Sequence, residues 1–187
     1  AGSGYGTGYD SATLQNTNLF ASQDYDFSAS WTVPVGSAYP SLQWDATSYS
    51  NPTLASLLTT GAGTSGSPYE IGSADTLKNM VLAVNLYSAA RTAYYKLTAD
   101  LNMNGTPFAG VGSVAIAFAG YFDGNNKTIS NLTLLVPAKA GMAGLFNNVS
   151  GGSYHDLTIN SLTINAPTVS YVGGIIGYST GTATVSN

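Results

Sequence analysis

Hydrophobic residues recur with two different periods along the chain, and the period changes near residue 90. Between residues 73 and 88, apolar positions follow the i, i+3, i+4, i+7 spacing of a helix with one buried face; they are Leu77, Met80, Val81, Val84 and Tyr87. Ser73 or Asp75 can serve as the N-cap. The pattern therefore predicts one amphipathic helix over residues 73–88.

From residue 94 onward, apolar and polar residues alternate in short runs separated by Gly and Asn, which indicates strands joined by tight turns. The alternation is clearest where Thr stands between two aliphatic residues, in the pairs Leu132/Leu134, Leu157/Ile159 and Leu162/Ile164. We expect the aliphatic side chains to point inward and each Thr to point outward.

These runs also repeat. Gly120-Tyr-Phe, Gly144-Leu-Phe and Gly174-Ile-Ile stand 24 and 30 residues apart, and SNLTL at 130–134 is followed 25 residues later by HDLTI at 155–159. A period of about 20–30 residues is typical of proteins in which each repeat buries its apolar face only against its neighbours. The repeat predicts an all-β fold of short parallel strands wound into stacked coils.

The order of these segments resembles the GLUG-motif repeat family of bacterial surface and secreted adhesin-like proteins. The resemblance lies in YEIGSADTLKNM, YYKLTADLNMNG and FAGYFDGNNKTISNLTL, then in AGLFNNV, YHDLTI and VGGIIGY, and it covers about residues 69–187. It implies a right-handed parallel β-helix (β-solenoid) with a role in adhesion or display. One departure is FNNVSGG, because the family more often has Gly after Phe146.

Three segments follow from this interpretation. Residues 1–45 are expected to be the β-rich exit segment of a preceding module, residues 46–68 a Ser/Thr/Gly/Pro-rich linker, and residues 69–187 a new module with a helical cap. The last run, VGGIIGYSTGTATVSN, still has the repeat pattern. We therefore expect either that the natural protein continues or that identical subunits stack end to end.

The amino-acid composition limits the classes of partner that the chain can bind. Charged residues make up 7% of the 187-residue chain and hydrophobic residues 44%, so solubility depends on uncharged polar side chains. The five basic residues are scattered and the net charge is −4, which disfavours nucleic acid and anionic membrane surfaces. No apolar run reaches the length of a membrane helix. The chain has no cysteine, which excludes disulfides and thiolate metal sites.

Candidate catalytic groups are few. Asp100 and Asp123 could approach each other across adjacent coils as a glycosidase pair, but Asp123-Gly124-Asn125 has the composition of a tight turn, with Gly at positive φ. His155 is the only histidine, and on a regular strand it and Asp156 point to opposite faces. We expect no catalytic, cofactor or metal residues, with Asp123, Gly124, Asn125 and Asp75 serving turns and the helix cap.

Two other groups of residues suggest binding or modification. Asp24 and Asp26 share a strand face but lack the further oxygens that calcium needs. Trp31, Tyr39 and Trp44 are expected to fill a small core rather than to stack on sugars. Four asparagines lie in N-x-[ST] sequons, and they are candidate glycosylation sites: Asn104, Asn126, Asn131 and Asn148.

The sequence thus predicts a non-catalytic, extracellular stalk or display module that uses no cofactor. One alternative is a carbohydrate-binding module that uses exposed aromatic residues to bind host or matrix glycans. A second alternative is a polysaccharide lyase or hydrolase of the β-helix type.

Overall fold

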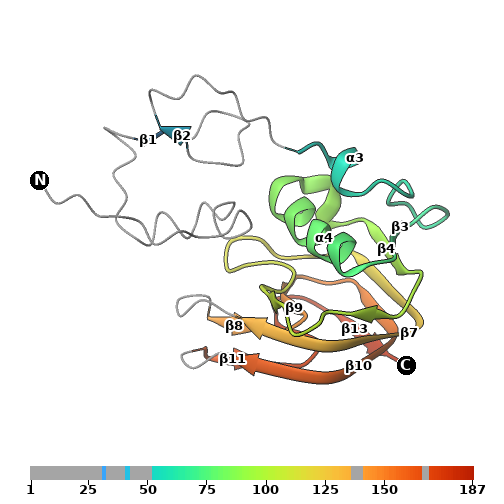
Figure 1. Ribbon diagram of the computed structural model, residues 1–187, viewed down its shortest axis with the longest axis vertical. Coiled ribbons are helices and arrows are strands. Elements are labelled where there is room, and N and C mark those ends of the chain that lie inside the picture. The colour runs from blue at the N-terminus through green and yellow to red at the C-terminus, as the bar shows by residue number, and fades with distance from the viewer. Residues whose placement is uncertain (1–30, 33–40, 43–51, 136–140, 166–168) are drawn as a thin grey trace, which may run out of the picture. The chain divides into compact units, whose positions relative to one another are not determined.

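A computed structural model describes residues 31–32, 41–42, 52–135, 141–165 and 169–187 (Figure 1). The chain forms two compact units, residues 1–53 and residues 54–187. In the first unit, β1 (Trp31–Thr32) pairs antiparallel with β2 (Ser41–Leu42). The second unit holds every other element described below.

The second unit begins earlier than the sequence pattern predicts. A short helix, α3 (Leu54–Leu57), opens it, and Leu57 and Leu58 are buried in the same core as the later strands. Residues 54–68, expected to be part of a linker, therefore belong by their packing to the second unit. The physical reason is that burying Leu57 and Leu58 removes their apolar surface from water, which stabilises the packing of this Ser/Thr/Gly-rich stretch against the core.

The predicted helix is present as α4 (Ala74–Leu86) and is followed by the 3₁₀ turn η1 (Ser88–Arg91). Its buried residues are Leu77, Met80, Ala83 and Val84; Ala83 was not predicted, and Val81 and Tyr87 of the predicted face are only partly buried. The helix ends two residues early, with Tyr87 as its C-cap. There, Arg91 donates from Nε to the Val84 carbonyl at 3.0 Å and from a terminal nitrogen to the Asn85 carbonyl at 3.1 Å.

The largest sheet in the described part of the second unit is a seven-stranded parallel sheet with the order β13-β10-β7-β4-β3, in which β5 and β6 also pair with β7 (Figure 1). Its strands are β3 (Tyr69–Ile71), β4 (Tyr94–Leu97), β5 (Leu101–Asn102), β6 (Pro107–Phe108), β7 (Tyr121–Leu135), β10 (Ser153–Asn165) and β13 (Thr184–Ser186). Successive passes of the chain thus lie side by side in the same direction.

Two further pairs of strands are also parallel. β8 (Met142–Ala143) pairs parallel with β11 (Tyr171–Val172), and β9 (Phe146–Val149) pairs parallel with β12 (Ile176–Ser179). The strands β8 and β9, which follow β7 in the chain, therefore lie beside β11 and β12, which follow β10. The prediction of an all-β fold with parallel pairing is confirmed at this level.

The registers correct part of the predicted repeat. Leu132 pairs with Leu162 and Phe146 with Ile176, so the true interval in both places is 30 residues. SNLTL therefore pairs with NSLTI and not with HDLTI, whose Leu157 lies opposite Lys127. The Gly120 run is also not equivalent to the Gly144 run, because Tyr121 pairs with Ser153. The error arises because the Leu-Thr-Ile pattern occurs twice within one long strand, β10.

The core runs through all these passes. One inward row crosses the main sheet as Tyr95, Phe122 and Tyr154, each almost fully buried. Phe146 packs against this row, with its ring centroid 5.2 Å from Phe122 and 4.6 Å from Tyr154. No single pass could bury these rings alone, so the passes share one hydrophobic interior.

Candidate functional site

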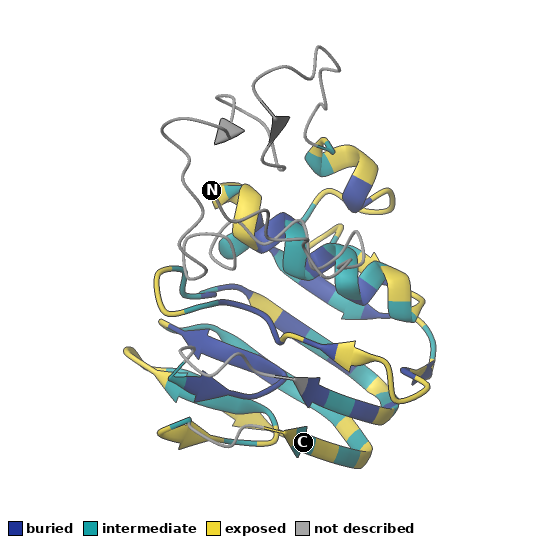
Figure 2. Ribbon diagram, turned by 60° about the vertical axis from the view of Figure 1, so that its left-hand side comes forward, coloured by how far each residue is buried: buried dark blue, intermediate teal, exposed yellow. Residues whose placement is uncertain are grey.

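The β13 end of the second unit carries exposed apolar side chains. The inward row ends at Val185, which is 51% exposed although it lies in register with the buried Tyr154. Tyr171 and Val172, on β11, are 51% and 54% exposed. Figure 2 shows burial decreasing from the α4 side toward the C-terminal strand. Among the described residues, β13 has a strand neighbour on one side only, so this edge can accept another strand.

A second candidate surface is the outward face of the main sheet, where two rows run side by side. One row is charged and brings Glu70, Lys96, Asp123 and His155 into register on four successive strands. Lys96 Nζ lies 3.5 Å from Asp123 Oδ2. The neighbouring row contains Tyr94 and Tyr121, whose rings stack with centroids 4.2 Å apart.

His155 and Asp156 do not point to opposite faces, which corrects the expectation drawn from a regular strand. Asp156 has φ 53°, and the register between β10 and β7 shifts between His155 and Leu157. This bulge turns two consecutive side chains to the same side. His155 Nδ1 lies 2.8 Å from Asp156 Oδ2 and 3.7 Å from Asp123 Oδ1.

The two carboxylates weighed as a glycosidase pair both accept hydrogen bonds from the backbone. Asp123 Oδ1 accepts from the Asn125 amide at 2.7 Å, and Asp100 Oδ1 accepts from the Thr128 amide at 2.8 Å. The first is the side chain-to-backbone bond of an Asx turn. Asn125 also donates from its side chain to the Leu97 carbonyl at 2.9 Å, which fixes the turn against the preceding strand.

Gly124 is required for a different reason from the one predicted. The positive φ angles in this turn belong to Asn125 (50°) and Asn126 (56°), not to Gly124. A Cβ on Gly124 would lie 2.4 Å from the Asp156 carbonyl oxygen, much closer than real contacts allow. The glycine therefore permits the close approach of β10 to β7.

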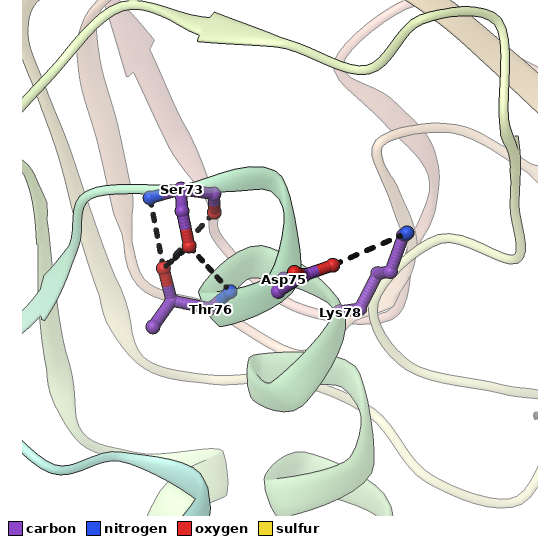
Figure 3. Close-up of polar contacts among 4 residues, drawn as sticks. All are labelled: Ser73, Asp75, Thr76 and Lys78. Carbon is purple, nitrogen blue, oxygen red and sulfur yellow. Dashed lines mark hydrogen bonds and ion pairs between the residues drawn. The ribbon is translucent and has the colours of Figure 1, made fainter.

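The helix cap is Ser73 rather than Asp75. Ser73 Oγ accepts from the Thr76 amide at 3.1 Å, and Thr76 Oγ1 accepts from the Ser73 amide at 2.9 Å, which completes a capping box (Figure 3). Asp75 lies in the first turn, is 89% exposed and pairs with Lys78 at 3.5 Å. Its charge there still complements the helix dipole.

The asparagines of the four sequons differ in solvent exposure. Asn104, Asn126 and Asn131 are exposed, and all three have φ between 51° and 56°. Asn148 is buried, and its amide donates to the Ser113 carbonyl at 2.8 Å. Glycosylation of the folded chain is therefore compatible with the first three positions and not with Asn148.

The role of Asn147 was not predicted from the sequence. This buried side chain accepts from the Gly144 amide at 3.1 Å and donates to the carbonyls of Ala109 and Gly112. It thus joins β9 to the loop before β7. The sequence offers one indication, because Asn147 occupies the place where the GLUG family more often has Gly.

Several predicted residues lie outside the described part. Asp24, Asp26, Tyr39 and Trp44 are not described, and for Trp31 only the backbone pairing is given. The expectations that Asp24 and Asp26 lack the ligands for a calcium site and that the aromatic residues fill a small core therefore stay predictions. Among the described residues, no helix is both long and apolar enough to cross a membrane.

Comparison with known proteins gives one informative similarity. No family model matches the sequence, and no solved structure matches it. The chain is 33% identical over 136 residues to Halomucin of Haloquadratum walsbyi (strain DSM 16790 / HBSQ001), in a match that covers 66% of this chain. The chain spans about 1% of the length of Halomucin, so the similarity concerns one small part of a very long protein.

Proposed function

We propose that the chain is a non-catalytic structural segment of a surface or secreted protein, built as a right-handed β-solenoid that serves as a stiff stalk or display module. The observation that carries this proposal is the unbroken inward row from Tyr95 through Phe122 and Tyr154 to the half-exposed Val185. A ladder of parallel strands with one continuous core resists bending, because each pass is hydrogen-bonded to the next.

The exposed edge indicates how such a module would be continued. Covering the side chains of Tyr171, Val172 and Val185 would contribute on the order of 3 kcal/mol, since a large apolar side chain gains about 1.5–3 kcal/mol on full burial. A strand of the same kind fits best, because it extends the parallel register already present in β7, β10 and β13. A following repeat would supply such a strand, whereas an identical subunit would offer its own β13 edge, because α4 covers the β3 end.

The similarity to Halomucin supports a surface-associated role in general, and its extent supports a segment of a longer protein. The resemblance to GLUG-type repeats supports adhesion or display, and it accounts for α4 as a cap beside β3, at the far end of the sheet from β13. The proposed localisation is therefore extracellular, at the cell surface.

Self-association of the purified chain tests the stacking mode of this proposal. We expect sedimentation velocity to show dimers whose fraction increases with protein concentration, because α4 covers the β3 end and leaves the β13 edge to associate, and electron microscopy to show paired particles. Lysine at Val172 and Val185 places charges in the edge and should leave monomers. Val114→Lys is the matched control, because Val114 is 62% exposed in a turn away from the edge. If the lysine variants and Val114→Lys assembled equally well, the proposal that the β13 edge mediates self-association would be contradicted.

A tandem chain of two copies tests the other mode. If the natural protein continues with like repeats, the covered edge should raise the thermal midpoint of unfolding above that of one copy. If single copies stay monomeric and the tandem chain unfolds at the same temperature as one copy, the stalk proposal fails.

The stacked Tyr94–Tyr121 pair favours carbohydrate binding as a second candidate. Tyr121 is 40% exposed and lies beside the charged row, so a sugar could stack on its ring while its hydroxyls bond to the neighbouring carboxylates. A glycan array probed with the wild type and with Tyr121→Ala tests this function. Binding that disappears in the variant would support a carbohydrate-binding module, and no binding by the wild type would exclude it for the glycans on the array.

A further inference from the structure

Three side chains that bind metals well meet on the outward face of the main sheet. They are Asp123 on β7 and His155 and Asp156 on β10, and one ligand atom from each lies within 4.8 Å of the other two. The side chains of these residues are 30–41% exposed, so an ion can reach them from solvent while part of their surface is already desolvated.

The backbone holds this arrangement in three ways. The bulge at Asp156 (φ 53°) places its carboxylate beside the imidazole of His155. The Asn125 amide donates to Asp123 Oδ1 and fixes that carboxylate. Gly124 lets β7 and β10 approach closely at this point. The cluster is therefore positioned by main-chain geometry and does not depend on long flexible side chains.

We propose that Asp123, His155 and Asp156 bind a divalent first-row transition metal of the Zn²⁺ type, which bridges β7 and β10. One imidazole nitrogen and two carboxylate oxygens form a mixed N/O set that suits such ions, whereas calcium needs six to eight oxygens. Water would complete the coordination on the exposed side.

The distances agree with this assignment. In a tetrahedral site with metal–ligand bonds of about 2.0–2.2 Å, ligand atoms lie roughly 3.4 Å apart. The distances from His155 Nδ1 to Asp156 Oδ2 (2.8 Å) and to Asp123 Oδ1 (3.7 Å) lie on either side of that value. Side-chain rotations that move the ligand atoms by a few tenths of an ångström would therefore bring both distances to the value that the ion requires.

Lys96 distinguishes this site from a simple ion-pair network. Its Nζ lies 3.5 Å from Asp123 Oδ2, so the ammonium and the proposed metal use different oxygens of one carboxylate. The ammonium repels a nearby cation, and its removal should tighten metal binding. In a network without a metal, the same change would only remove an ion pair.

Calorimetric titration of the 187-residue chain with ZnCl₂, in a buffer that does not bind zinc, tests the proposal. We expect one ion per chain with a dissociation constant in the micromolar range. His155→Ala and Asp156→Asn should each weaken binding at least about tenfold. Asn tolerates the left-handed backbone at position 156, so the second variant keeps the fold. Lys96→Met should tighten binding about two- to fivefold.

Two controls separate loss of the site from loss of the fold. Asp75→Asn removes an exposed carboxylate far along the chain and should bind zinc like the wild type. Circular dichroism of each variant without metal reports folding, and added zinc should raise the thermal midpoint of the wild type but not of His155→Ala. If the folded His155→Ala variant binds zinc as tightly as the wild type, or the wild type shows no binding at millimolar zinc, the proposal is overturned.

Discussion

At the scale of single residues, Asn147 links parts of the chain that are far apart in the sequence. Its side chain satisfies the Gly144 amide and the carbonyls of Ala109 and Gly112 inside the core. Asn147→Ala leaves these backbone groups without a partner, and an unsatisfied buried polar group costs about 1–3 kcal/mol. We expect the free energy of unfolding to fall by about 2–4 kcal/mol, measured by urea denaturation.

Asn160→Ala is the matched control, because Asn160 is an exposed residue of β10. Its removal should change the free energy of unfolding by less than about 0.5 kcal/mol. If the two substitutions had equal effects, the hydrogen bonds of Asn147 would contribute nothing measurable to stability.

The sequence alone could not reveal the residue-scale geometry of the Asp–His cluster. Alternation along a strand places His155 and Asp156 on opposite faces, and only the bulge at Asp156 reverses this. A bulge depends on what the neighbouring strand offers, here the close approach at Gly124. The Asx turn at Asp123 was predictable because its hydrogen bond spans two residues.

At the scale of elements, α4 is the part that local sequence specifies best. Its apolar stripe and its cap lie within one stretch of chain, so periodicity and Ser73 together indicated it. Ser73→Ala removes the oxygen that accepts from the Thr76 amide. We expect the free energy of unfolding to fall by about 1 kcal/mol, measured by thermal or urea denaturation.

Two further substitutions make this test specific. Ser73→Asp keeps an acceptor at the cap and should retain most of the stability. Ser65→Ala removes a hydroxyl from an exposed turn and should change little. A loss at Ser73 no larger than the loss at Ser65 would show that the capping box does not stabilise α4.

The strands were predictable in kind but not in register. Alternation identified the strand character of β7 and β10, yet the motif Leu-Thr-Ile occurs twice in β10, at Leu157–Ile159 and at Leu162–Ile164. Either copy matches Leu132–Leu134 in sequence. The structure pairs Leu132 with Leu162, so the second copy is the equivalent one.

At the scale of the whole second unit, the sequence predicted a shared interior, and the core cluster extends from Leu57 to Tyr154. What the pattern missed is where that interior begins, because residues 54–58 carry only a few leucines in polar surroundings. A periodic signal needs several turns or strands to be visible. A single short helix such as α3 is too short to show a periodic signal.

The aromatic part of this interior should make the fold sensitive to alkaline pH. Burial raises the pKa of Tyr95 well above its ordinary value of 10.0, with a smaller effect from Tyr69, and burial also raises the pKa of Tyr154. Each hydroxyl donates to a carbonyl, that of Ala90 at 2.8 Å and that of Gly151 at 3.0 Å. Both phenols therefore stay protonated in the folded state above pH 10.

In the unfolded state the same phenols lose their protons as pH rises through about 10, so the folded state then holds more protons and its stability falls with pH. We expect full stability below pH ~10, and a loss of up to about 2.7 kcal/mol per pH unit above it, since each group contributes at most about 1.4 kcal/mol per unit. Urea denaturation between pH 8 and pH 11.5, in steps of about half a unit, measures this slope.

The double variant Tyr95→Phe, Tyr154→Phe should lose most of the slope, although its stability at pH 8 falls by about 1 kcal/mol for each missing hydrogen bond. Tyr171→Phe should keep the slope, because Tyr171 is 51% exposed and lies outside the buried aromatic core. An unchanged slope in the double variant would mean that groups outside the aromatic core control alkaline unfolding.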